Sequence, residues 1–153
     1  MVHRRCYRDA VRWATLVLLT LVACNDLREF RGQWRGSRVG DAGSVLRTGP
    51  GSAATLSIDH IDGHGLGGRL AVDDLLRETA ITSLPGAEAD VLSGITFSGA
   101  PLRVYLAFVA VPDGGGGALV VIALYDDRRV ELRLLRGEPA SLYAIFPLAE
   151  VPP

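Results

Sequence analysis

From Phe30 onward, the sequence alternates apolar and polar residues with a period of two, and glycine, proline and aspartate interrupt this alternation at short intervals. Such alternation is typical of β-strands with one buried face, and no window carries the apolar stripe of a long helix. We therefore predict an all-β fold, an antiparallel meander of about eight or nine strands. The predicted strands are 31–39, 53–61, 65–73, 79–84, 101–111, 118–126, 129–136 and 141–148. A ninth strand is predicted over 89–97, unless residues 86–93 form a short helix instead.

A meander of this kind must close on itself or stack as two sheets, because open apolar edges promote aggregation. We expect a small barrel, with a β-sandwich as the alternative. The segments 101–111 and 118–126, joined by a loop over 112–117, are apolar on both faces. They should be central strands covered by more than one layer, or by a partner. Pro147 predicts a sheet edge or a strand end in the last strand.

The register of two hairpins follows from matching apolar faces. A three-residue loop over 62–64 pairs Ile61 with Gly65 and places Leu56 opposite Leu70.

The second hairpin has a two-residue turn over 127–128. This turn places Tyr125 opposite Val130 and predicts that Glu131 and Arg133 face solvent.

The first 23 residues have the anatomy of an export signal. Residues 3–12 are cationic, and 13–23 form an eleven-residue apolar run that ends in a small residue. A membrane-spanning helix needs about 20 apolar residues, whereas this run stops before Asn25. We predict a signal peptide over 1–23, with a permanent membrane helix as the alternative.

The run ends in Leu21, Val22, Ala23 and Cys24, a pattern that resembles the lipobox of bacterial lipoproteins. The whole chain resembles the short lipoproteins of GC-rich bacteria, a resemblance that implies no activity. In lipoproteins a peptidase cuts before the cysteine, whose thiol carries diacylglycerol and whose amine is often acylated too. The resemblance implies a signal peptide over 1–23, a lipidated cysteine and short tether over 24–30, and one all-β domain over 31–153.

The same resemblance implies export and anchoring to membrane lipid through Cys24. Asn25 after this cysteine favours the outer membrane, on its periplasmic or surface face, although Asp26 follows directly. The alternative is that Cys24 is an ordinary buried residue in an uncleaved helix.

Charge and cysteine content exclude several function classes. Beyond residue 23 the chain carries 12 Arg against 16 acidic residues, a net charge of −4, which argues against nucleic-acid binding. Cys6 lies in the leader and Cys24 would be modified, so no thiol or disulfide chemistry is expected in the domain.

The segment Gly32, Gln33 and Trp34 is similar to the start of the first strand in lipocalin-like (calycin) barrels. The resemblance implies that Trp34 plugs a closed barrel end against an arginine of the last strands, Arg133 or Arg136. The alternative is an ordinary core tryptophan in another β-barrel or sandwich.

Histidine occurs after the leader only in the cluster Asp59, His60, Asp62 and His64. Metal binding would need these side chains to converge on one centre. His60 shares strand parity with Ile58, whereas Asp62 and His64 lie in the turn, so convergence is not expected. We predict a polar hairpin tip, with no metal site and no cofactor.

Other polar motifs have simpler structural interpretations. The adjacent acids at 73–74 and 126–127 would point to opposite faces of a strand, so they are expected to be solvated turn acids rather than acid/base pairs. The glycine run at 114–117 precedes a strand instead of a helix, which makes it a turn rather than a phosphate-binding loop. The loop over 40–52 is either an ordinary surface loop or a binding lip.

No serine or cysteine nucleophile with a histidine and an orienting acid stands out, so we expect a protein without enzyme activity. An enzyme using the 59–64 hairpin is a weaker alternative. Tyr105, Tyr125 and Tyr143 recur on three late strands, where they could line a barrel interior or ring its mouth. The alternative, which we favour, is ordinary packing in the core or on the surface.

The sequence thus predicts a membrane-anchored binding module for a small apolar ligand or an envelope component. The alternative is a structural or protein-interaction lipoprotein. A ligand-binding barrel needs an internal cavity of roughly 300 Å³ or more. An interaction module needs a filled interior and an exposed apolar patch.

Overall fold

The computed structural model describes residues 26–39, 51–85, 95–112, 116–136 and 141–152. A short 3-10 helix opens this part of the chain, and eight strands follow it. The elements are η1 (Leu27–Phe30), β1 (Gly32–Ser37), β2 (Ala53–Ile61), β3 (Leu66–Val72), β4 (Leu76–Thr82), β5 (Arg103–Ala110), β6 (Gly117–Leu124), β7 (Val130–Arg136) and β8 (Ser141–Glu150).

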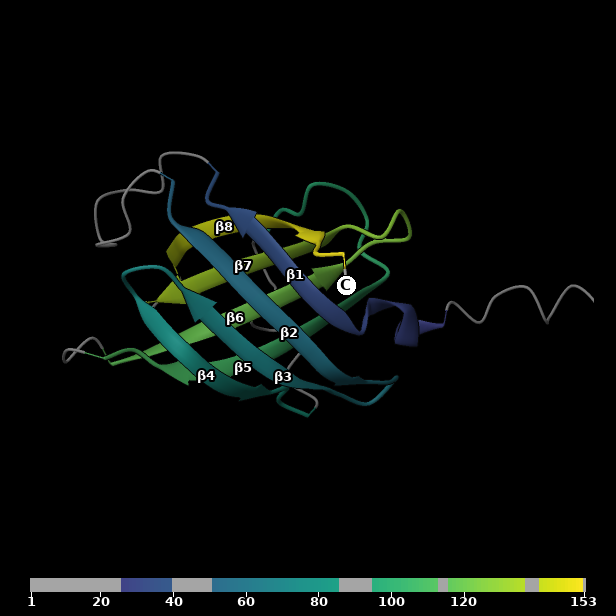
Figure 1. The fold of residues 1–153 in the computed structure, drawn as a ribbon, viewed down its shortest axis with the longest axis horizontal. Coiled ribbons are helices and arrows are strands. Elements are labelled where there is room, and N and C mark those ends of the chain that lie inside the picture. Colours follow the sequence, from purple (N-terminus) through teal and green to yellow (C-terminus); the bar gives the residue numbers. More distant parts are fainter. Residues whose placement is uncertain (1–25, 40–50, 86–94, 113–115, 137–140, 153) are drawn as a thin grey trace, which may run out of the picture.

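The eight strands form one antiparallel sheet in the order β4-β3-β2-β1-β8-β7-β6-β5, curled into a nearly closed barrel (Figure 1). The first and last strands lie side by side, which leaves β4 and β5 as the two edges of the sheet. The prediction of an all-β meander is confirmed, and each of the eight predicted ranges overlaps a strand, although β4 begins at Leu76, three residues before its predicted range. Of the ninth range, 89–94 lies outside the described residues and 95–97 has no regular structure.

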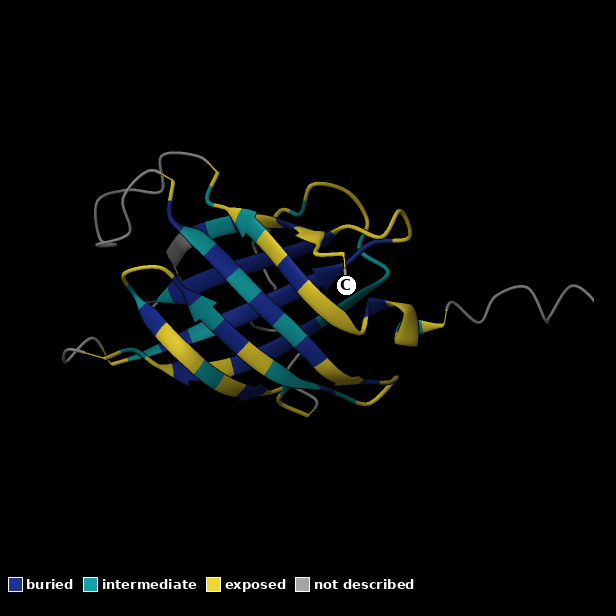
Figure 2. Cartoon of the chain, viewed as in Figure 1, coloured by how far each residue is buried: buried dark blue, intermediate teal, exposed yellow. Residues whose placement is uncertain are grey.

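The barrel interior is built from the inward face of every strand. Burial alternates along β2 and β3, whereas β6 and β7 are buried on both faces (Figure 2). Side chains with no exposed surface include Phe30, Trp34, Leu56, Leu132 and Phe146. The period-two pattern therefore reflects an inward face that is filled by large side chains.

A second layer explains the apolar outer face of β5, β6 and β7. Leu106, Val121 and Leu135 lie on this face, yet at most 3% of their surface is exposed. Ile95 and Phe97 pack on them from outside the barrel. The expectation that the strands near 101–111 and 118–126 are covered by more than one layer is confirmed. The expectation that both are central is wrong for the first, because β5 is an edge strand of the sheet.

The β2–β3 hairpin contains a β-bulge. Leu56 pairs with Leu70 as predicted, but Ile61 pairs with Leu66 instead of Gly65. The register shifts between Ile58 and His60 because β2 carries one extra residue there. The predicted loop was therefore one residue too short.

The predicted register of the β6–β7 hairpin is wrong by one residue. Leu124, not Tyr125, pairs with Val130. The loop contains three residues because Arg128 adopts a left-handed conformation with φ of 61°. A one-residue slip exchanges the two faces of a strand.

Gly117, predicted to end the β5–β6 loop, is instead the first residue of β6 and pairs with Ala110. The ring of Phe108 covers Gly117 so closely that a Cβ there would lie 1.7 Å from the ring's Cζ atom.

Pro147 lies inside β8, not at a sheet edge or strand end as predicted. The paired residues of β1 and β8 are Trp34 with Glu150 and Arg35 with Ala149. Pro147 comes just beyond this short ladder, where a strand can accept a residue that has no N–H to donate.

The two ends of the barrel carry different elements. One end, which we call the N-terminal end, carries η1, the β2–β3 tip (residues 62–65), the β6–β7 turn and the end of β8 (Figure 1). The opposite end carries the β3–β4 turn and the β5–β6 loop. This polarity follows from the antiparallel pairing of all neighbouring strands.

We expect Trp34→Phe to lower the free energy of unfolding by about 1–3 kcal/mol, because the buried carbonyl of Phe30 loses its hydrogen-bond donor. In the structure the indole Nε1 of Trp34 donates to this carbonyl at 2.9 Å, and its ring stacks on that of Phe30. Urea unfolding measures the change. Gln33→Ala, at the exposed neighbouring position, is the control and should change stability by less than about 0.5 kcal/mol. Equal effects of the two substitutions would contradict the prediction.

Candidate functional site

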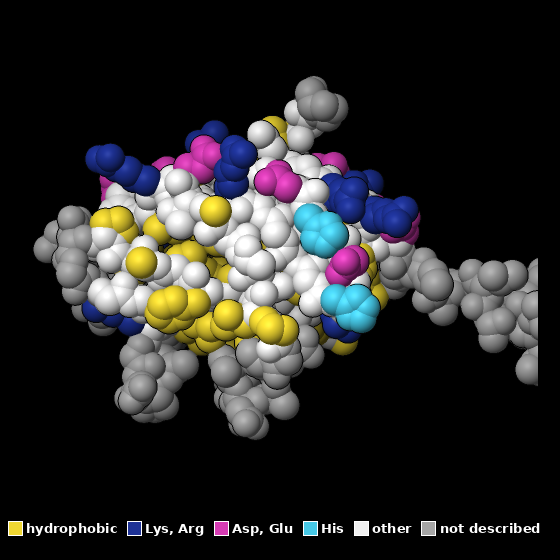
Figure 3. All heavy atoms as spheres, turned by 90° about the horizontal axis from the view of Figure 1, so that it is seen from below, with side chains coloured by type: hydrophobic (Ala, Val, Ile, Leu, Met, Phe, Trp, Pro, Cys, Tyr) yellow, Lys and Arg dark blue, Asp and Glu magenta, His cyan; other side chains and the backbone are white. Residues whose placement is uncertain are grey.

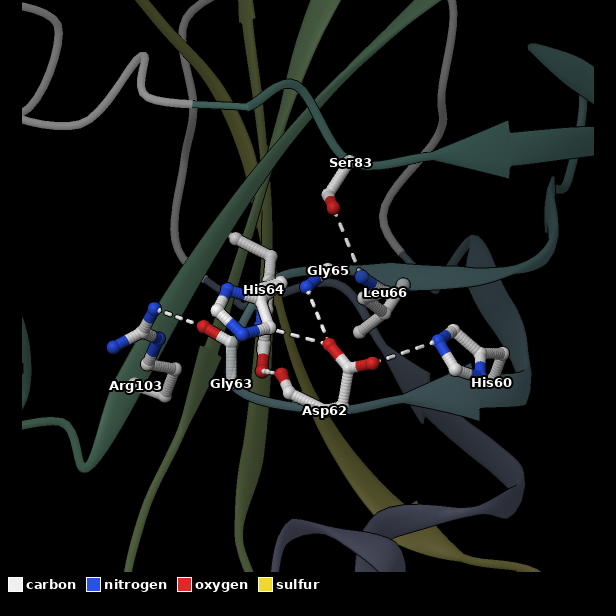
Figure 4. Close-up of polar contacts among 9 residues, drawn as sticks. His60, Asp62, Gly63, His64, Gly65, Leu66, Ser83 and Arg103 are labelled. Carbon is white, nitrogen blue, oxygen red and sulfur yellow. Dashed lines mark hydrogen bonds and ion pairs between the residues drawn. The ribbon is translucent and has the colours of Figure 1, made fainter.

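The β2–β3 tip is organised by the carboxylate of Asp62 (Figure 4). Its Oδ1 accepts hydrogen bonds from the backbone N–H groups of His64, at 2.7 Å, and Gly65, at 2.9 Å. An aspartate that bonds the backbone two and three residues ahead closes a turn by itself. The Asp-Gly sequence therefore has a structural reason to stand at this tip.

The bulge before His60 determines where the histidine points. His60 does not share the buried face of Ile58, as its strand parity predicted, because Asp59 and His60 are both exposed. The Nε2 atom of His60 lies 3.2 Å from Oδ2 of Asp62, and their side chains are 61% and 48% exposed. Asp59 instead accepts a hydrogen bond from the hydroxyl of Ser57.

Two residues of β5 hold the tip against the barrel. The hydroxyl of Tyr105 donates to the carbonyl of Asp62, and Nη2 of Arg103 donates to that of Gly63, both at 2.6 Å. Figure 4 shows the side chain of Arg103 beside the tip, with its hydrogen bond to the carbonyl of Gly63. The sequence gives no signal for this role of Arg103, because no local pattern links two segments 40 residues apart.

The three tyrosines divide between different environments. Tyr105 is buried in the core of the barrel, while its hydroxyl reaches the tip. Tyr125 is buried at the β6–β7 turn, where its hydroxyl lies 3.4 Å from that of Ser98. The side chain of Tyr143 lies outside the described residues.

Within the described parts of the chain, no group of three or more His, Cys, Asp or Glu is arranged to hold a metal ion. The adjacent acids lie in turns, as predicted. Asp73 accepts a hydrogen bond from the backbone N–H of Ala53, and Asp127 forms an ion pair with Arg129. The tip and these acids thus stabilise turns of the fold.

A buried ion pair lies on the outer face of β7. Glu131 and Arg133 were expected to face solvent, which is wrong, because only 7% and 6% of their surfaces are exposed. The Nε atom of Arg133 donates a hydrogen bond to the carboxylate of Glu131. The hydroxyl of Ser98 donates to Glu131 at 2.7 Å, and Nη2 of Arg133 donates to the carbonyl of Thr96 at 2.9 Å.

Residues 95–99, which we call the covering segment, account for this burial. The guanidinium of Arg133 lies 4.9 Å from the ring centre of Phe97. Trp34 stacks on Phe30 at the N-terminal end. Arg133 is therefore engaged with the covering segment, a contact that the calycin resemblance did not anticipate.

A surface pocket of about 360 Å³ lies at the opposite end of the barrel. Its walls combine apolar and charged residues, which are Ala71, Val72, Asp73, Asp74, Leu75, Leu76, Arg77 and Pro112. The pocket lies beside the edges of β4 and β5, outside the packed interior. No local sequence motif predicted it, because its wall joins the β3–β4 turn to a residue after β5.

Comparison of the chain with protein-family models, curated proteins and solved structures finds no match.

No helix in the described residues is long and apolar enough to cross a membrane. Cys24, the predicted signal peptide over 1–23 and most of the loop over 40–52 lie outside the described residues. The same holds for Gly114 and Gly115 of the glycine run over 114–117.

Arg133→Met should lower the free energy of unfolding by about 3–5 kcal/mol, because it leaves the buried carboxylate of Glu131 without its cationic partner. Arg69→Met is the matched control. It breaks an ion pair whose side chains are 63% and 65% exposed, and should cost less than about 1 kcal/mol. Chemical unfolding compares the two. The double variant Glu131→Leu/Arg133→Met should recover most of the loss, and a single-variant loss no larger than that of Arg69→Met would contradict the prediction.

We expect the carboxyl group of Asp62 to titrate below its ordinary pKa of 3.8, because the N–H groups of His64 and Gly65 stabilise its charged form. A lowered folded-state pKa contributes stability that is present above the unfolded pKa and lost as pH falls through the folded value. The contribution of the charged Asp62 carboxylate to the stability of the tip should therefore be lost only as the pH falls below 3.8. Carboxyl carbon NMR measures the midpoint. His64→Ala keeps the backbone donor and should keep the pKa low, whereas a midpoint at or above the ordinary value would refute this explanation.

Proposed function

We propose that this protein is a membrane-anchored lipoprotein whose β-barrel binds another component of the cell envelope through its outer surface. The observation that carries the proposal is the lipobox-like sequence ending at Cys24, directly before an independently packed barrel. Two or more acyl chains make membrane attachment stable, since each buried methylene contributes about 0.8 kcal/mol.

The start of the fold supports a close approach of the barrel to the membrane. η1 begins at Leu27, so three residues beyond Cys24 the chain is already part of the domain. Three extended residues span about 10 Å. With Cys24 in the bilayer, the N-terminal end of the barrel would face the lipid and the opposite end would face away from it.

The packing of the barrel supports binding on its surface rather than inside it. The inward faces carry large side chains without exposed surface, including Trp34, Phe30 and Phe146. On the outside, by contrast, 61% of the surface of Phe108 is exposed. A filled interior together with an exposed apolar surface favours a protein-interaction module over a carrier of small apolar ligands.

Intact mass measurement and acyl labelling in a bacterial host test the anchor. The wild-type chain should lose the 23 residues before Cys24 and gain acyl mass, because the thiol of Cys24 is the acceptor. Cys24→Ala should do neither. Cys6→Ala is the matched control, since it removes the other cysteine and should leave processing unchanged. An unmodified Cys24 in the wild-type protein would refute the proposed anchor.

A further inference from the structure

The barrel is incompletely closed between β4 and β5. Within the described residues, one bridge joins these strands, between Ser83 and Ala107. Next to it, the N–H of Leu84 donates a 2.6 Å hydrogen bond to the carbonyl of Leu106. Beyond this point β4 and β5 are the two edges of the sheet. Beyond the bridge, residues 76–82 of β4 face residues 108–112 across a gap. We call this gap the β4–β5 seam.

The backbone directions along β4 follow from two hydrogen bonds. The N–H of Ser83 donates to Leu66 beside β3, whereas the N–H of Leu84 donates toward β5. Alternate residues of a strand direct their N–H and C=O groups to opposite sides. Ala80 lies four residues before Leu84 and so has the same orientation. Its N–H and C=O groups therefore point into the seam.

The same alternation applies to β5. The carbonyl of Leu106 faces β4, while Val111 bonds Gly116 on the other side. Ala110 therefore faces the seam. Continuing the register of the Ser83–Ala107 bridge would bring Ala80 opposite Ala110, but the described residues show no pairing there. Both strands thus present unpaired backbone donors and acceptors at this position.

The pocket lies where the seam opens, at the end of the barrel opposite η1. Leu75, Leu76 and Pro112 contribute apolar walls, and Asp74 and Arg77 contribute charge. Within the part of the chain that the structure describes, neither Asp74 nor Arg77 forms an ion pair. Together with Asp73, the pocket lining carries two carboxylates against one guanidinium, so it complements a basic group.

Apolar surface extends along the outside of the seam. Phe108, beside the seam, is 61% exposed, and Leu84, at the bridged end of the two strands, is 41% exposed. Figure 3 shows hydrophobic side chains gathered on this face, with the two histidines of the β2–β3 tip toward the other end. The seam therefore combines unpaired strand edges, an apolar flank and a pocket of net negative charge.

We propose that the β4–β5 seam binds an extended segment of a partner protein, which adds as a strand to β4. An apolar side chain of that segment fills the pocket, and a lysine or arginine two residues along the segment, on the same face, contacts Asp74. Main-chain hydrogen bonds give such strand addition its affinity, and pockets for alternate side chains give it specificity. An acyl chain would fill the pocket but leave the backbone groups of Ala80 and Ala110 unpaired.

The inference rests on the proposed function and specifies its binding site. Anchoring through Cys24 would direct the N-terminal end toward the lipid, so the open end of the seam would face away from the membrane. A partner segment could then reach the seam without entering the bilayer.

Fluorescence anisotropy on the full chain in mild detergent tests the proposal with synthetic heptapeptides. Each peptide has a central Leu and a charged residue two positions to either side of it, Lys in one set and Glu in the other, with Thr or Val at the remaining positions. We expect the Lys peptides to bind more tightly than the Glu peptides. Asp74→Lys should reverse this order, because it reverses the charge beside the pocket.

Ala80→Pro is the decisive variant. It removes the N–H that faces the seam and keeps the hydrogen bonds to β3, so it suits an edge strand. Losing the hydrogen bond from this N–H to the peptide backbone should weaken the binding of the Lys peptides by about tenfold. Ala80→Thr keeps the N–H and should bind within about twofold of the wild type, since exposed substitutions have small effects. Amide hydrogen exchange should show new protection at Ala80 when the peptide binds.

Three results would overturn the proposal. One is binding of none of the peptides to the wild-type chain, and another is equal binding to Ala80→Pro and Ala80→Thr. The third is concentration-dependent dimerisation that protects Ala80 without peptide, which would assign the seam to a second copy of the chain. Failure of the anchor is measured separately, because Cys24→Ala removes acylation and should bind the peptides unchanged.

Discussion

The short pairing of β1 with β8 decides whether eight strands form a barrel or two separate sheets. Trp34 pairs with Glu150 and Arg35 with Ala149. Gly36 permits the close approach, since a Cβ there would lie 1.8 Å from the carbonyl oxygen of Pro147. This contact joins the sheet of the first four strands to that of the last four, and encloses one common core. It also makes β4 and β5, instead of β1 and β8, the two edge strands of the sheet.

The closure at β1 and β8 and the opening at β4 and β5 are therefore two consequences of one topology. A meander whose ends meet within the sheet must place its middle strands at the edges. The chain between β4 and β5 crosses to the outer face of β7, where Phe97 and Thr96 contact Arg133. Because β4 and β5 are joined by a long connection rather than a tight hairpin, no turn geometry forces them to pair.

The covering segment changes the character of the barrel wall. Glu131 and Arg133 would be ordinary solvent-facing residues on a bare outer face, and their polarity is what an outer face requires. Covered by residues 95–99, they satisfy each other and bond Ser98 and Thr96. The apolar residues on the same face, Leu106 among them, are buried by the same segment. The outer wall of β5 to β7 is thus a second, smaller core.

The sequence by itself determined the all-β class, the eight strand positions and the pairing of Leu56 with Leu70, because period-two alternation and turn residues are local signals. It also predicted the polar tip, where Asp62 bonds residues two and three ahead. Only the tertiary structure decided that Glu131 is buried, that Arg103 pins the tip, and that β4 and β5 part to form a pocket. A bulge at Asp59 and a left-handed Arg128 each shift a register by one residue, and neither leaves a local signal. These features depend on contacts between distant segments, which no local pattern encodes.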